Sequence, residues 1–203
     1  MPRVLTLDAF MATSSAGLVA DGVLLGWCRA EADLAELPLL VEALFADHGR
    51  HLDIVAVVAG PGSFTGLRAS IALAHGLGLA SGASVVGVTV AAALNPGGAR
   101  PIWAAVDSKR GRVFLDRSGE IGSFAVDALP LPTGPIALGG DAALAAGEFL
   151  ASQGVDVQLT TPLLPDPLGI AAAALAGRTV APQPVYVDPP AARPGAAGRP
   201  APA

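Results

Sequence analysis

The sequence contains little charge and few aromatic residues. Charged residues make up 14% of its 203 positions and aromatic residues 4%, whereas hydrophobic residues reach 52%. We therefore expect a core built from many small Ala, Leu and Val side chains. Soluble domains usually carry about 25% charged residues, so this chain has too little charge to cover every face. Part of its apolar surface is expected to contact another protein.

The chain also has little basic charge, one cysteine and no clustered metal ligands, and each of these excludes a class of function. The formal net charge is −5, which argues against a nucleic-acid site carried by this chain alone, because such sites need clustered Lys and Arg. The single cysteine, Cys28, gives no disulfide framework and fits a reducing cytoplasm. No Cys/His cluster has the spacing of zinc ligands. His48 and His51 are expected to face solvent and His75 stands alone, so no metal site is predicted.

The sequence predicts no membrane segment. The uncharged run 69–94 is long enough to raise the question. It contains His75 and several glycines, however, and then changes to β-branched residues, which indicates a helix, a turn and a buried strand. Near the N-terminus, Asp8 interrupts the apolar run, so no signal peptide is predicted. We expect a cytoplasmic protein.

A glycine-rich run is the most distinctive stretch of the chain. It follows a β-type run and opens an apolar helical pattern, and its residues are Gly60, Pro61, Gly62, Ser63, Phe64, Thr65, Gly66, Leu67 and Arg68. Its glycines permit close backbone approach, and Ser63 or Thr65 can cap the helix. The loop is therefore expected to hold an anion or a partner's backbone. The alternative is a loop that only joins a strand tightly to a helix.

The order of apolar patterns predicts the fold class. Strands are expected at 4–8, 16–20, 23–30, 54–59 and 84–88, with helices at 37–47 and 67–80, and then at 102–107, 113–116, 136–138 and 155–159, with helices at 142–153 and 168–176. Three antiparallel strands followed by helix–strand units indicate an α/β protein with the actin-like ATPase (ribonuclease H-like) fold, two lobes with mixed sheets. We expect an N-terminal lobe at 1–98, a smaller lobe at 99–188 and a disordered Pro/Ala-rich tail at 189–203.

The two helices of the first lobe are apolar on every side. A helix with one wet face shows a polar stripe, but Glu42 is the only charge inside 37–47, and Arg68, Ser70 and His75 are the polar residues of 67–80. Their second faces are expected to contact another subunit, a second copy or a related partner; cover by the second lobe is the alternative. The predicted interface residues are Leu37, Leu40, Val41, Leu44, Leu67, Ile71, Ala74 and Leu77.

The glycine-rich run resembles a known family. GPGSFTGLR at 60–68 matches in full the signature of the bacterial TsaB (YeaZ-type) proteins, and DSKRGRVF at 107–114 resembles their D-A-R-x-G-E-V-Y hairpin. Weaker matches occur at 86–88, 140–141 and 184–186. The resemblance covers residues 1 to about 187.

The resemblance implies a role in tRNA modification. TsaB proteins are non-catalytic partners of the related catalytic subunit TsaD and the small ATPase TsaE, in a complex that transfers a threonylcarbamoyl group to N6 of the adenosine next to the tRNA anticodon. By resemblance, this chain would act as a scaffold or activator that dimerises with TsaD, form a homodimer in isolation, and contact tRNA only through the complex. It would bind no cofactor alone, and ATP or ADP would bind at the partner interface.

The chain departs from the family in its first loop. The family's first strand ends in D-T-x-T, whereas Asp8 is followed here by Ala9, Phe10 and Met11. The rival function is a small-molecule kinase or ATPase of the actin-like class, with Asp8 and Asp107 as cleft carboxylates and the 60–66 loop at the phosphates. The missing hydroxyls weigh against that function, and no catalytic residue is predicted.

Overall fold

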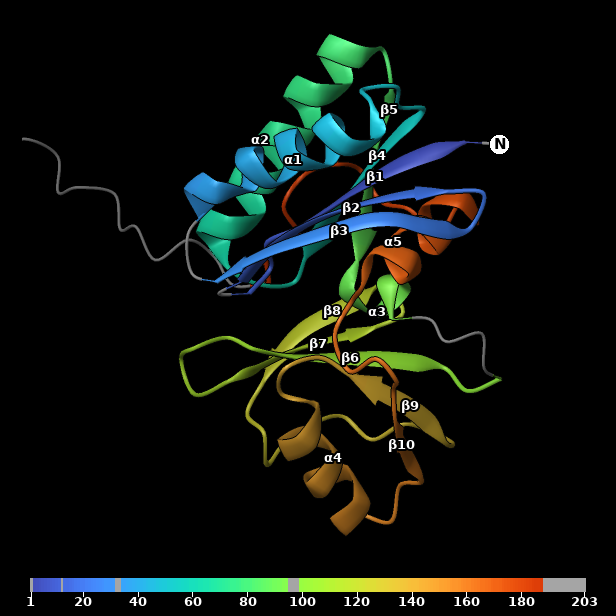
Figure 1. The fold of residues 1–203 in the computed structure, drawn as a ribbon. Helices are drawn as coiled ribbons and strands as arrows, with labels where there is room; N and C mark the ends of the chain where they lie inside the picture. Colours follow the sequence, from blue (N-terminus) through green and yellow to red (C-terminus); the bar gives the residue numbers. More distant parts are fainter. Residues whose placement is uncertain (1, 12, 32–33, 95–98, 188–203) are drawn as a thin grey trace, which may run out of the picture.

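Two five-stranded mixed sheets organise the molecule, one above the other in Figure 1. The structure is a computed structural model that describes residues 2–11, 13–31, 34–94 and 99–187. The tail expected at 189–203 lies outside the described residues.

The first sheet has the strand order β3-β2-β1-β4-β5. Its strands are β1 (Arg3–Asp8), β2 (Thr13–Ala20), β3 (Val23–Glu31), β4 (Ile54–Gly60) and β5 (Ser84–Thr89). β1, β2 and β3 are antiparallel neighbours, whereas β4 runs parallel to both β1 and β5. Asp21 and Gly22 both have positive φ and form the turn expected between β2 and β3. The continuous apolar run of β4 is buried at the centre, as parallel strands covered on both faces require.

The second sheet repeats the topology of the first. Its strands are β6 (Ile102–Asp107), β7 (Val113–Arg117), β8 (Glu120–Phe124), β9 (Ile136–Gly139) and β10 (Val157–Leu159), in the order β8-β7-β6-β9-β10. β6, β7 and β8 are antiparallel neighbours, and β9 is parallel to β6 and β10. β8 was not predicted from the sequence, because its Glu, Gly and Ser residues hide its strand character.

Two helices cover the outer side of the first sheet. α1 (Leu37–His48) packs on β2 and β3, and α2 (Phe64–Ser81) packs mainly on β4. Figure 1 shows both helices on the side of this sheet that faces away from the second lobe. α2 begins three residues earlier than expected because Ser63, not a later residue, is its N-cap.

The chain returns to the first lobe after the second sheet. α5 (Pro167–Leu175) packs on all five strands of the first sheet and on α3 (Val90–Ala93), whereas α4 (Ala143–Ser152) packs on the second sheet. Pro167 lies so close to Gly17 that a Cβ there would be 2.4 Å from the proline ring. The expected second lobe at 99–188 therefore includes a helix, α5, that packs on the strands of the first sheet.

Residues 180–187, called the C-terminal strap below, also belong to the first lobe. Val180 and Gly87 exchange backbone hydrogen bonds of 2.8 and 3.0 Å, so the strap covers the edge of β5. The Val185 N–H donates to the Ala59 carbonyl at 2.9 Å. Of the helices in the described residues, none is long and apolar enough to cross a membrane.

Candidate functional site

The glycine-rich loop is packed against the first loop of the chain. The Ser63 N–H donates to the Phe10 carbonyl at 2.7 Å, and the Ser63 hydroxyl accepts from the Gly66 N–H at 3.3 Å. A Cβ on Gly62 would lie 2.3 Å from the Phe10 oxygen, and one on Gly66 would lie 1.9 Å from the Ala9 oxygen. The absence of side chains at these glycines thus makes room for backbone carbonyls of the same chain.

The first loop is apolar, and this explains how it seals the glycine-rich loop. Ala9 and Phe10 are buried, and Ala9 stands where the TsaB pattern D-T-x-T has its first threonine. The Asp8 carboxylate accepts from the Phe10 N–H at 3.1 Å and so holds the loop in place. Burial raises the pKa of Asp8 to about 7, against the opposing effects of that hydrogen bond and of the Arg29 charge. Asp8 thus supports its own loop.

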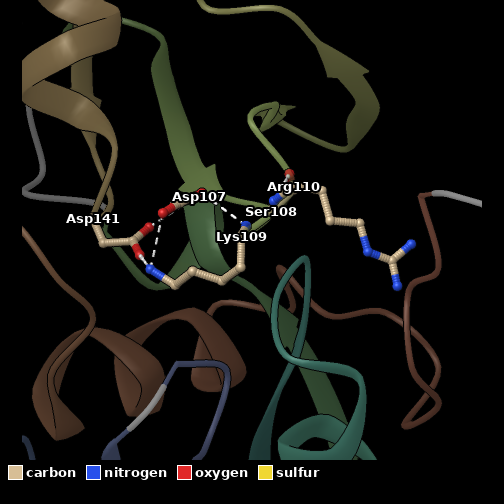
Figure 2. Close-up of polar contacts among 5 residues, drawn as sticks. All are labelled: Asp107, Ser108, Lys109, Arg110 and Asp141. Atoms are coloured by element: carbon tan, nitrogen blue, oxygen red, sulfur yellow. Dashed lines mark hydrogen bonds and ion pairs between the residues drawn. The ribbon is translucent and has the colours of Figure 1, made fainter.

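Asp107, the other expected cleft carboxylate, belongs to a polar cluster on the second lobe (Figure 2). The Lys109 ammonium lies 2.9 Å from the Asp107 carboxylate and 3.5 Å from that of Asp141. The Asp141 carboxylate also accepts from the Asp107 N–H at 2.8 Å. Lys109 lowers the pKa of Asp107, and Asp107 raises the pKa of Lys109. Among the described residues, no hydrogen bond or ion pair joins Asp8 to Asp107.

The histidines lie apart and have different neighbours. The His75 ring nitrogen is 3.0 Å from the Pro182 carbonyl, and His51 lies 3.7 Å from the Asp53 carboxylate. His48 packs over Gly26. Within the described ranges, no group of three or more His, Cys, Asp or Glu side chains could hold a metal ion.

The predicted interface residues face the core of the first lobe and not the surface. Leu37, Val41, Leu44, Leu67, Ile71 and Ala74 are buried in the core of the first lobe. Leu40 and Leu77 are partly buried against the same core. Because the helices are apolar on every side, the sequence did not show which face meets the sheet, and the prediction chose the inner one.

The opposite side of the two helices carries exposed apolar residues, with Glu42 and His75 beside them. We call it the outer helix face and define it by Leu39, Ala43 and Ala46 of α1 and Ala72, Gly76 and Leu79 of α2. Leu79 is 89% exposed and Leu39 is 66% exposed. The second lobe lies on the far side of the sheet, so it does not cover this face (Figure 1). The alternative of cover by the second lobe is therefore wrong.

A side-chain cluster joins α2 to the C-terminal strap. The Arg68 Nε donates to the Tyr186 hydroxyl at 2.7 Å, and the Arg68 guanidinium lies 3.8 Å from the centre of the Phe64 ring. The rings of Phe64 and Tyr186 are 5.4 Å apart. Phe64 and Arg68 were predicted site residues, but Tyr186 was not, because it is 118 positions away from Arg68 in the sequence.

Comparisons with known sequences relate this chain to the TsaD and TsaB proteins. The model of the TsaD family, described as tRNA N6-adenosine threonylcarbamoyltransferase, matches residues 30–129. The tRNA threonylcarbamoyladenosine biosynthesis protein TsaB of Escherichia coli (strain K12) is 31% identical over 122 residues, which are 55% of this chain and 53% of that protein. These matches confirm the resemblance to the TsaB family. The chain spans about half the length of this curated relative.

Solved structures similar to this chain extend the likeness to its whole fold. YeaZ from Pseudomonas aeruginosa has a TM-score of 0.71 at 24% identity and covers 92% of this chain and 100% of its own. EutJ, an ethanolamine utilization protein from Carboxydothermus hydrogenoformans, has a TM-score of 0.51 at 17% identity and covers 84% of this chain and 89% of its own. The actin-like, ribonuclease H-like fold class with two mixed sheets is confirmed.

Proposed function

We propose that this chain takes part in the threonylcarbamoyladenosine modification of tRNA as a non-catalytic scaffold or activator subunit. It dimerises with a TsaD-like catalytic subunit and works with a TsaE-like ATPase. The similarity to TsaB of Escherichia coli supports the pathway, and the match to the TsaD family model supports a partner built on the same fold. A chain of net charge −5 would contact tRNA through the complex.

The outer helix face carries this proposal. Two large side chains, Leu39 and Leu79, stand exposed among small residues, Ala43, Ala72 and Gly76. Small residues let a second pair of helices approach closely, and the exposed leucines supply the area that association buries. The charges beside the face are Arg68 of α2 and Glu42 of α1, so most of it is apolar surface exposed to water. It is therefore the surface that we assign to the catalytic partner.

We assign no catalytic or phosphate-binding role to the glycine-rich loop of the isolated chain. Its glycines accommodate the carbonyls of Ala9 and Phe10, and the Ser63 N–H is used by Phe10. ATP or ADP would accordingly bind at the partner interface, where the catalytic subunit adds its own groups.

The test combines tRNA analysis with a surface variant. Cells that lack this chain are complemented with the wild type, with Leu79→Glu or with Leu144→Glu, and threonylcarbamoyladenosine in their tRNA is measured by mass spectrometry. Leu144 is the matched control, because it is 60% exposed on α4 of the second lobe. We expect the wild type and Leu144→Glu to restore the modified nucleoside and Leu79→Glu to fail. Normal modification in cells without this chain would contradict the proposal.

A further inference from the structure

One end of the outer helix face carries an ordered positive charge. Phe64, Arg68, Ala72 and Leu79 follow one stripe of α2, because residues four or seven positions apart lie on the same side of a helix. The C-terminal strap runs past this end of the stripe, and its Tyr186 hydroxyl holds the Arg68 Nε at 2.7 Å. The apolar stripe therefore ends in a guanidinium group flanked by two aromatic rings.

The Arg68 side chain is held in one orientation. Its guanidinium lies over the Phe64 ring at 3.8 Å and near the Tyr186 ring at 5.6 Å. Phe64 is 47% exposed and Tyr186 49% exposed, so the cluster stands at the surface. A guanidinium that is already ordered loses less conformational freedom on binding than a free one. Among the described residues, its two terminal nitrogens have no hydrogen-bond acceptor, and they remain available to a ligand.

Among the described residues, no ion pair joins Arg68 to an acidic side chain. Neither α2 nor the C-terminal strap contains an Asp or Glu. Arg50 shows the contrast: its guanidinium also stacks on a ring, that of Phe45 at 5.3 Å, but it donates to the Glu42 carboxylate at 3.1 Å. Arg68 thus has no acidic partner among the described residues of this acidic protein, and a negative group of a partner would complement it.

We propose that the Phe64–Arg68–Tyr186 cluster is a receptor for a carboxylate side chain of the catalytic partner. The planar fork of the two terminal nitrogens suits a bidentate carboxylate, and the flanking rings exclude water from the pair. The C-terminal strap then forms part of the docking surface rather than only covering the edge of β5. This inference rests on the proposed function, since it names the chemistry at one end of the surface assigned to the partner.

The test measures binding of this chain to the purified TsaD-like subunit of the same organism by titration calorimetry. Arg68→Gln is expected to weaken binding about tenfold or more, the usual effect of losing a charge-assisted hydrogen bond. Arg68→Lys is expected to lose nearly as much, because Lys keeps the charge but not the planar fork. Tyr186→Phe, which keeps the ring and frees the Arg68 Nε, should have a smaller effect. Arg100→Gln, which removes an ion pair with Asp156 in the second lobe, is the control and should bind like the wild type.

The outcomes separate this inference from the function on which it rests. Circular dichroism first shows that each variant is folded. If Leu79→Glu abolishes binding while Arg68→Gln binds like the wild type, the carboxylate receptor is wrong and the docking face stands. If the wild type does not bind the catalytic subunit, the proposed function fails and this inference fails with it. If Arg68→Gln binds the partner normally but the complex loses affinity for tRNA, the anion is an RNA phosphate, which also overturns the inference.

Discussion

The two lobes have the same strand order but differ in their loops and in an added helix. In each lobe, a glycine in the first turn of a helix or just before a helix lies against a backbone carbonyl at or near the end of the first strand. A Cβ on Gly66 would meet the Ala9 carbonyl at 1.9 Å, and one on Gly140 would meet the Ala105 carbonyl at 2.1 Å. The same close approach thus joins the first strand to the helix-bearing loop in both lobes, which makes it a property of the fold.

The differences lie in the loops and in the added helix. The loop after β1 is apolar and buried, whereas the loop after β6 is polar and holds Lys109 between Asp107 and Asp141. Only the first lobe has a helix between its third and fourth strands among the described residues, namely α1. In the first lobe, the glycine-rich loop is therefore filled by the chain's own backbone, and α1 adds a second helix to the outer side of the sheet.

The largest loss of stability is expected when a methyl group is placed where these two glycines contact a carbonyl oxygen. Gly66→Ala and Gly140→Ala should each lower the free energy of unfolding by about 3 kcal/mol, because the new methyl group overlaps a backbone oxygen that cannot move away. Gly140 also has φ of 101°, a conformation that alanine rarely adopts. Urea unfolding followed by circular dichroism measures both.

Gly76→Ala is the matched control for these substitutions. Gly76 lies in the middle of α2, and nothing lies within 4 Å of the position of a new Cβ. Alanine should stabilise the helix there by about 0.5–1 kcal/mol. If Gly66→Ala proved as harmless as Gly76→Ala, the first loop would not be packed as described.

The next largest loss of stability is expected at the junction between the two lobes. The buried Asp116 on β7 accepts from the Ala91 N–H of α3 at 3.0 Å and from the Gly119 N–H at 2.8 Å. Asp116→Ala leaves both donors without this acceptor and should cost about 2 kcal/mol in urea unfolding. Asp166→Ala, which removes the cap of α5 within the first lobe, should cost about 1 kcal/mol. Equal costs would show that the junction is no more sensitive than an ordinary helix cap.

Asp8 and Asp107, the carboxylates at the ends of β1 and β6, should change the stability of the fold over different ranges of pH. The folded-state pKa of Asp8 is raised, so the folded protein binds more protons than the unfolded chain, and its stability falls as the pH rises toward about 7. Asp8 alone should account for a loss of about 1.4 kcal/mol between about pH 6 and pH 8. Asp8→Asn should remove that loss, as measured by thermal unfolding across this range.

Asp107→Asn is the control for this measurement. Lys109 lowers the pKa of Asp107, so its ionisation affects stability only in more acidic solution, below the unfolded-state value of 3.8. Its profile between about pH 6 and pH 8 should follow that of the wild type. A wild-type slope that persists in Asp8→Asn would mean that the Asp8 carboxyl is not desolvated.

Much of the fold could be predicted because its signals are local. The hairpin at Asp21 and Gly22, the apolar run of β4 and the Ser63 cap each lie within a few residues of the element that they define. β8 gave no such signal, since its Glu120, Gly122 and Ser123 have neither apolar alternation nor β-branching.

The site was harder to predict because its features are non-local. That α5 packs on the first sheet depends on the path of the chain and not on its own sequence. The contact of Arg68 with Tyr186 joins two ends of the first lobe. The side of α1 and α2 that faces the sheet could not be predicted, because apolar residues surround both helices. An inner position such as Val41 and an outer one such as Leu39 therefore look alike until the sheet is in place.

The central claim is that the first lobe, and not the second, carries the partner surface. The most direct measurement is the affinity of the TsaD-like subunit for three forms of this chain: the wild type, the double variant Leu39→Glu/Leu79→Glu and the double variant Leu131→Glu/Leu144→Glu. All four leucines are more than half exposed, so neither pair should disturb folding. We predict that the first double variant loses binding, because association would bury unpaired carboxylates, and that the second binds like the wild type. Equal binding by all three forms, or loss of binding in the second-lobe variant alone, would contradict the account.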